Sequence, residues 1–87
     1  MKKTIEYPAI FRVDAEDNKF INVSFPDIFG GVTFGEGMKD AMYMAEDLLK
    51  LMLTNAPAQC MAPHSLEETK NNFPGEQVLM VKVEIDK

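Results

Sequence analysis

The sequence predicts an α+β domain in which one helix packs on one face of a four-stranded mixed sheet, in the chain order β-β-β-α-β. Two kinds of pattern lead to this prediction. The segment 38–53 repeats apolar residues with a helical period, whereas 5–13, 20–25 and 77–85 show the two-residue alternation of strands. Clusters of Asp, Asn, Pro and Gly separate these segments, which is typical of turns.

The helix has the strongest pattern in the chain, with apolar residues at i, i+3, i+4 and i+7. These residues are Met38, Ala41, Met42, Ala45, Leu48, Leu49, Met52 and Leu53. Gly37 is the expected N-cap, and Asp40 lies in the first turn, where the helix dipole favours negative charge. Pro57 ends the helix, because the residue before a proline is pushed out of the helical region. A helix with one apolar face needs a surface to cover, and the sheet provides it.

Four strands are expected, over 5–13, 20–25, 32–34 and 77–85. The turn DAEDNK (14–19) consists of residues that hydrogen-bond their own backbone, so the second strand returns antiparallel to the first. Ser65 and Glu68 have the spacing of a capping box and predict a short helical turn before the last strand. A right-handed crossover over one sheet face would then make the fourth strand parallel to the first.

A single helix leaves the opposite face of such a sheet uncovered. The apolar side chains expected on that face are the candidate partner-binding residues Pro8, Ile10, Phe20, Val78 and Met80. An apolar patch of this kind on a small monomer is usually covered by a partner or by a second copy. A shift of one residue in register would turn the same side chains inward. On the first interpretation, Ile10→Asp weakens association and leaves the fold intact.

Size and composition limit the possible functions. The 87 residues, 46% hydrophobic and 26% charged, are expected to form one globular domain. A net charge of −5 argues against direct binding of nucleic acid and suits a basic protein partner. No apolar run approaches the roughly 18 residues that span a bilayer, and a single cysteine fits a reducing compartment. These features predict a cytoplasmic protein without a membrane partner.

The residue types that carry catalysis or bind metals are sparse. His64 is the only histidine, and the sequence nominates no group that would orient it as a general base. Cys60 has no basic neighbours that would activate its thiol. The carboxylates of Asp14, Glu16 and Asp17 fall in a turn, where solvation is favoured over metal binding. No catalytic residue, metal site or cofactor is predicted, and the chain is not expected to be an enzyme.

Three blocks of residues, YPAIF (7–11), VSFPD (23–27) and TFGE (33–36), have a spacing that resembles the HicB antitoxin family. Pro63-x-Ser65 and the strand over 78–85 extend the resemblance over nearly the whole chain. It implies a partial RNase H-like fold without the RNase H catalytic carboxylates. It also implies the antitoxin of a type II toxin–antitoxin pair, which binds the basic mRNA-cleaving toxin HicA and masks its active-site histidine. Family members commonly form dimers or tetramers.

The chain departs from the family pattern in three places. Phe29-Gly30-Gly31 stands where Pro-Gly-Cys is usual, and Gly37 replaces a Ser or Thr cap. The sequence ends at Lys87, where many members continue into a DNA-binding domain. The expectation is therefore a single HicB-like domain over 1–87, with no C-terminal DNA-binding domain and no nucleic-acid binding by this chain alone.

Three functions follow from these observations. The first is an antitoxin that covers the active site of a HicA-like ribonuclease. The alternative is an orphan HicB-like domain that self-associates and has a non-enzymatic regulatory or structural role. A third, a minimal hydrolase using Asp or Glu with a divalent metal, rests only on analogy with the RNase H fold. An adjacent gene for a short basic protein with one histidine would favour the first.

Overall fold

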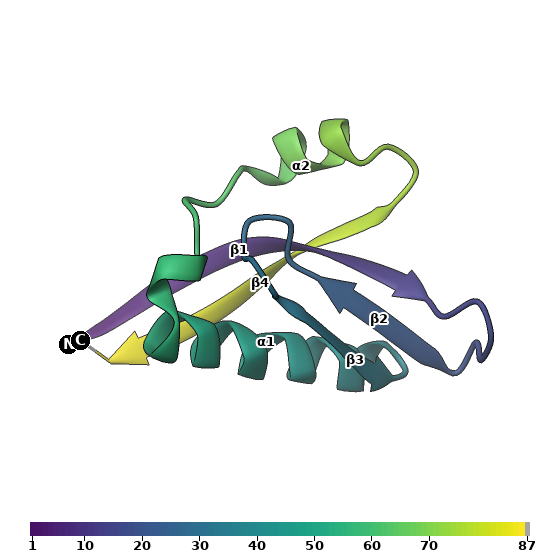
Figure 1. Ribbon diagram of the computed structural model, residues 1–87, viewed down its shortest axis with the longest axis horizontal. Helices are drawn as coiled ribbons and strands as arrows, with labels where there is room; N and C mark the ends of the chain where they lie inside the picture. The colour runs from purple at the N-terminus through teal and green to yellow at the C-terminus, as the bar shows by residue number, and fades with distance from the viewer. Residues whose placement is uncertain (87) are drawn as a thin grey trace.

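The computed structural model describes residues 1–86, which form an α+β domain with four strands and two α-helices (Figure 1). The strands are β1 (Lys2–Val13), β2 (Phe20–Ser24), β3 (Val32–Glu36) and β4 (Gln77–Asp86). The helices are α1 (Met38–Asn55), the 3₁₀ helix η1 (Pro57–Gln59) and α2 (Leu66–Asn72). The predicted α+β class is confirmed. Residue 87 of the expected domain lies outside the described residues.

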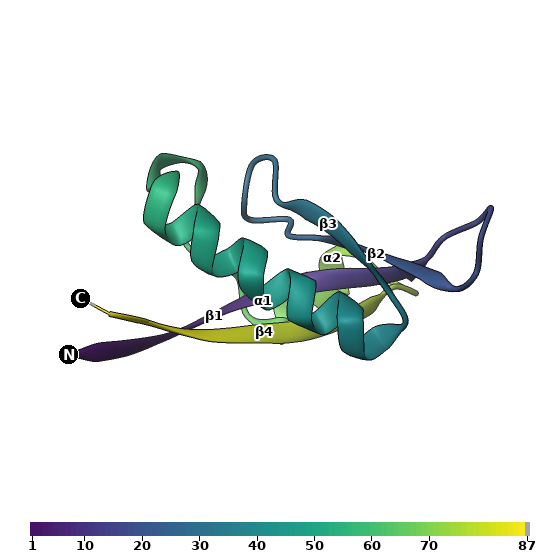
Figure 2. The same cartoon turned by 90° about the horizontal axis from the view of Figure 1, so that it is seen from below.

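The sheet has the order β3-β2-β1-β4, and every neighbouring pair is antiparallel. The prediction of a mixed sheet with a parallel fourth strand is therefore wrong. The reason is the segment 57–76, which contains η1 and α2 and runs back along the sheet on the face opposite α1 (Figures 1 and 2). This return brings the chain to the opposite end of the sheet before β4 begins, so β4 runs antiparallel to β1. The prediction of a single helix on the sheet is also wrong, because η1 and α2 lie on the other face.

The main core lies between α1 and the sheet. Ala41, Ala45 and Leu49 form the buried stripe of α1, and each is 0% exposed. They belong to a cluster with buried side chains from the sheet and the β2–β3 loop, including Tyr7, Ala9, Phe11, Ile21, Val23, Phe25, Ile28, Val81 and Val83. The predicted helix ends are confirmed, since Gly37 is the N-cap and Asn55 is the last helical residue before Pro57.

The second helix begins with the predicted capping box. The Ser65 hydroxyl accepts the Glu68 backbone N–H at 3.1 Å, and the Glu68 carboxylate accepts the Ser65 N–H at 3.2 Å. The hydrogen bond from the Ser65 N–H to the carboxylate makes the largest contribution to lowering the pKa of Glu68. The helix continues for seven residues rather than one turn, with the buried Thr69 hydroxyl donating to the Ser65 carbonyl at 2.8 Å.

The β1–β2 turn is organised by Asp14. Its carboxylate accepts the Asn22 side-chain N–H at 2.9 Å and the backbone N–H groups of Glu16 and Asp17 at 3.1 and 3.0 Å. The bond from Asn22 makes the largest contribution to lowering the pKa of Asp14 below its ordinary 3.8, and the two backbone bonds add to it.

This lowered pKa predicts an acid-dependent loss of stability. The ionised Asp14 stabilises the folded state above pH 3.8, and this contribution disappears as the pH falls from 3.8 through the lower folded-state pKa. Asp14→Asn should therefore flatten the pH dependence of the urea midpoint below that pH. Glu16→Gln is the matched control, because its side chain makes none of the three bonds. An equal flattening in the control would contradict the assignment to Asp14.

Candidate protein-binding surface

The five predicted binding residues do share the sheet face that points away from α1. Pro8 pairs with Met80 and Ile10 with Val78 across β1 and β4, and Phe20 follows the same alternation on β2. The expectation that this face is open is wrong for Pro8, Ile10 and Val78, which are all buried. Phe20 and Met80 are half-buried.

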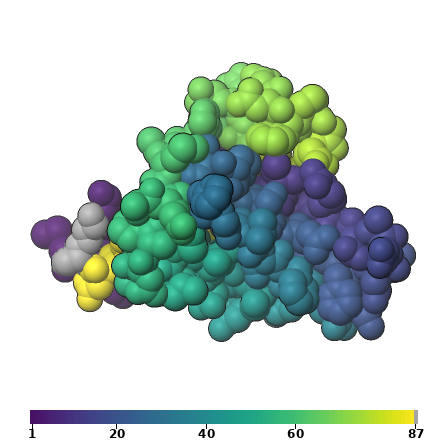
Figure 3. All heavy atoms as spheres, in the orientation of Figure 1, coloured from purple at the N-terminus to yellow at the C-terminus, as the bar shows by residue number. Residues whose placement is uncertain are grey.

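The segment 57–76 is what covers these residues. It lies over the β1–β4 half of the face, and in Figure 3 it forms the raised green to yellow-green ridge above the rest of the molecule. Backbone hydrogen bonds fasten it to the β2–β3 loop. Phe29 donates to the Gln59 carbonyl at 2.9 Å, and Met61 donates to the Asp27 carbonyl at 2.9 Å. An isolated β-bridge joins Ile28 to Cys60.

A buried carboxylate completes this attachment. Asp27, 3% exposed, accepts the backbone N–H of His64 at 2.9 Å and lies 2.7 Å from the imidazole Nδ1. The Tyr7 hydroxyl donates to the Met61 carbonyl at 2.6 Å. Burial, followed by the negative charges of Cys60 and Asp27, raises the pKa of Tyr7. Asp27 and Tyr7 together anchor the segment 57–64 to the sheet and its loop.

Asp27 is also the orienting partner for His64 that the sequence does not reveal, since the two residues are 37 positions apart. An oriented imidazole is one part of an acid–base site. The adjoining depression of about 250 Å³ has no second carboxylate, because its other lining residues are Pro26, Met61, Thr69, Asn72 and Phe73. No cluster of three or more metal-binding side chains occurs within residues 1–86. The Asp27–His64 contact attaches the segment 57–64 to the β2–β3 loop.

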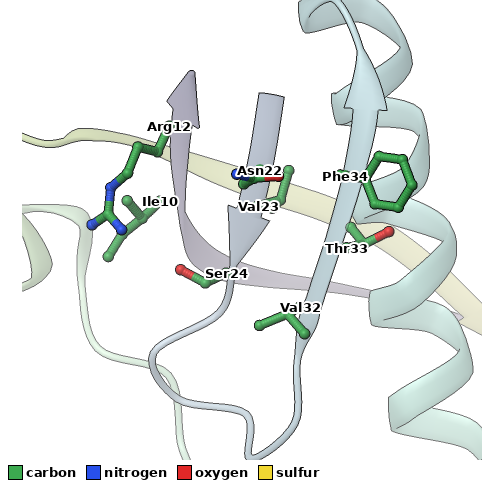
Figure 4. Close-up of a pocket in the computed structure, with 8 residues that line it drawn as sticks. All are labelled: Ile10, Arg12, Asn22, Val23, Ser24, Val32, Thr33 and Phe34. Carbon is green, nitrogen blue, oxygen red and sulfur yellow. The ribbon is translucent and has the colours of Figure 1, made fainter. Parts of the chain in front are cut away.

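The open half of the same sheet face lies over β2 and β3. Val32 and Phe34 of β3 are 67% and 58% exposed, and the rings of Phe34 and Phe20 meet edge to face at 5.9 Å. We call these three residues the β2–β3 surface. A depression of about 610 Å³ adjoins it (Figure 4). Its lining comes from three neighbouring strands and consists of Ile10, Arg12, Asn22, Val23, Ser24, Val32, Thr33 and Phe34.

Val32 and Phe34 were absent from the predicted binding residues. The expected third strand over 32–34 shows Val32 and Phe34 on one face and Thr33 on the other, but three residues do not indicate which face is turned away from α1. The structure extends β3 to Glu36 and pairs Phe34 with Asn22, and this register places both apolar side chains on the open face. The pairing of β3 with β2, which the sequence does not reveal, is what places them there.

The cations near the β2–β3 surface already have partners in the chain. Arg12 is ion-paired with Glu76, and the Lys19 ammonium lies 4.0 Å from the Asp17 carboxylate and 5.4 Å from the Phe20 ring centre. The surrounding chain carries a net charge of −5. The surface therefore combines exposed aromatic and aliphatic groups with an acidic background.

No family model matches this chain, and no curated protein matches it. Within residues 1–86, no helix is both long enough and apolar enough to cross a membrane.

Proposed function

We propose that this chain is a HicB-like antitoxin whose β2–β3 surface binds a basic, HicA-like mRNA-cleaving toxin and masks its active site. The observation that carries the proposal is the pair of largely exposed apolar side chains, Val32 and Phe34, beside a depression of about 610 Å³. Contiguous exposed apolar patches with a polar rim mark interaction sites, and Val32, Phe34 and Phe20 lie together on one sheet face.

Two properties of this surface would contribute to binding, its aromatic side chains and the acidic charge of the chain around it. The rings of Phe20 and Phe34, already in edge-to-face contact, supply a rigid apolar anchor, and such anchors account for much of the affinity at protein interfaces. The acidic balance of the chain speeds the encounter with a basic partner and disfavours nucleic acid. Binding of this kind needs no cofactor or catalytic residue, so the proposal includes a non-enzymatic, cytoplasmic role.

The proposal also includes a partial RNase H-like fold. The antiparallel β1-β2-β3 arrangement followed by α1 supports it. The antiparallel β4 and the additional α2 are departures from the expected arrangement. Both departures lie on the β4 side of the sheet, away from the β2–β3 surface.

Phe34→Asp tests this proposal directly. It places a charge at the centre of the apolar contact while altering a side chain that is 58% exposed. We expect titration calorimetry with the product of an adjacent gene encoding a short basic protein to show affinity reduced by about a hundredfold. Tyr43→Asp is the matched control, since Tyr43 is 64% exposed on the outer side of α1.

Unchanged affinity in Phe34→Asp, or equal loss in Tyr43→Asp, would reject this surface. The absence of any bound toxin would favour the orphan self-associating domain instead. Ile10→Asp is not a usable test, contrary to the expectation from the sequence. Ile10 is only 4% exposed, so a carboxylate there would be buried and would destabilise the fold.

A further inference from the structure

β4 presents a long unpaired edge. It is ten residues long, it ends the sheet order, and within residues 1–86 its ladder is formed with β1 alone. The outer N–H and C=O groups of an edge strand are a template for another strand. The free edge of β4 is therefore a potential interaction surface, separate from the β2–β3 surface at the other side of the sheet.

Two exposed side chains of β4 carry opposite charges at successive positions on the same face. Lys82 and Glu84 are successive residues on the face away from α1, with side chains 65% and 60% exposed. Each lies near an opposite charge on β1. Lys82 is 3.6 Å from Glu6, its partner in the register, and Glu84 is 4.0 Å from Lys2, which is diagonal to it. Exposed pairs of this kind are weak, so both groups remain able to meet a further charge beyond the edge.

We propose that β4 pairs antiparallel with β4 of a second copy, around a two-fold axis at Val83. In this register Lys82 faces Glu84 of the second copy, and the symmetry repeats the contact, giving two pairs of opposite charge. Val81 faces Ile85 in the same way. Cross-strand neighbours of opposite charge stabilise a sheet, and like charges directly opposite destabilise it.

The neighbouring registers lack this complementarity. An axis at Lys82 places the two lysines opposite each other, and an axis at Glu84 does the same for the two glutamates. An axis at Val81 sets Lys82 against Met80, so the lysine meets no counter-charge. The charge pattern therefore selects one register, and a two-fold axis perpendicular to the sheet keeps α1 on the same side in both copies.

The proposal does not depend on the antitoxin function. β3 and β4 are at opposite ends of the strand order, so dimer formation leaves the β2–β3 surface accessible. A dimer would present two such surfaces on one continuous sheet. Phe34→Asp should consequently abolish toxin binding without changing the mass of the dimer.

Charge reversal along β4 provides the test, with sedimentation velocity as the measurement and circular dichroism to check folding. We expect the unaltered chain to be dimeric at about 100 µM. Lys82→Glu and Glu84→Lys should each raise the dimer dissociation constant at least about tenfold, because each creates two like-charged contacts. The double variant Lys82→Glu/Glu84→Lys should restore the dimer, because it rebuilds both opposite-charge contacts.

Glu6→Gln and Lys2→Gln are the matched controls. They remove the same pairs within one copy but leave the β4 edge unchanged, so the dimer should persist. A chain that is monomeric at about 100 µM would overturn the proposal. A dimer that tolerates both single reversals, or a folded double variant as weak as the single ones, would overturn it as well.

Discussion

Replacing Gly35 by alanine should destabilise the domain by about 3 kcal/mol or more. A Cβ atom at this position would lie 2.4 Å from the backbone nitrogen of Ala41 and 2.6 Å from its Cα. These atoms belong to the first turns of α1, so the clash is relieved only if the helix moves away from β3. Ala41 is fully buried, and such a movement would open the main core. Urea denaturation followed by circular dichroism measures the loss.

Glu36→Ala is the control for this substitution, because Glu36 is the next residue of β3 and its side chain is exposed. Its effect should stay within about 0.5 kcal/mol. A domain stability in the usual range of about 5–15 kcal/mol would lose a large fraction through Gly35→Ala alone. A change in Gly35→Ala as small as that in the control would show that α1 has more freedom against β3 than the structure indicates.

Asp27→Ala should cost about 2–3 kcal/mol, since it removes charge-assisted hydrogen bonds from a buried position. Both bonds to His64 disappear, and the segment 57–64 loses its side-chain attachment to the β2–β3 loop. The local consequence is faster hydrogen exchange at the amide of His64, whose N–H bonds to the Asp27 carboxylate. The amide of Met61 bonds to the Asp27 backbone carbonyl, which alanine retains, so its exchange rises only as far as the whole segment loosens. Exchange measured by NMR together with urea denaturation checks both effects.

His64→Ala separates the two bonds, because it removes the imidazole and retains the backbone N–H. We expect a smaller loss of stability, about 1–2 kcal/mol, with the His64 amide still protected. Glu67→Ala, an exposed position at the start of α2, should leave exchange at both amides unchanged. Equal stability of Asp27→Ala and the unaltered chain would show that other contacts hold the segment in place.

The elements that local chemistry specifies were predicted closely. α1 follows from the apolar period between Gly37 and Pro57, and the start of α2 follows from the spacing of Ser65 and Glu68. The alternation in β1, β2 and β4 predicted correctly which side chains share a face. In each case the determining groups lie within a few residues of one another, and the sequence shows them directly.

The position of the open surface was not predicted, because it depends on the path of residues 57–76. That path is held by Asp27 with His64 and by Ile28 with Cys60, contacts between residues more than thirty positions apart. Without them, the fourth strand was expected to run parallel to the first, and Pro8, Ile10 and Val78 were expected to face outward. The return of the chain reverses β4 and moves the exposed apolar surface to Val32 and Phe34.

The amino-acid sequence is sufficient to predict the α+β class, the amphipathic helix, the strand periods and the acidic balance. Each of these is a property of neighbouring residues or of composition, so no knowledge of the folded chain is required. Only the folded chain shows the direction of β4, the burial of half the outer sheet face and the close approach of α1 that requires glycine at position 35. Those features depend on contacts between separate elements, and such contacts exist only once the chain is closely packed.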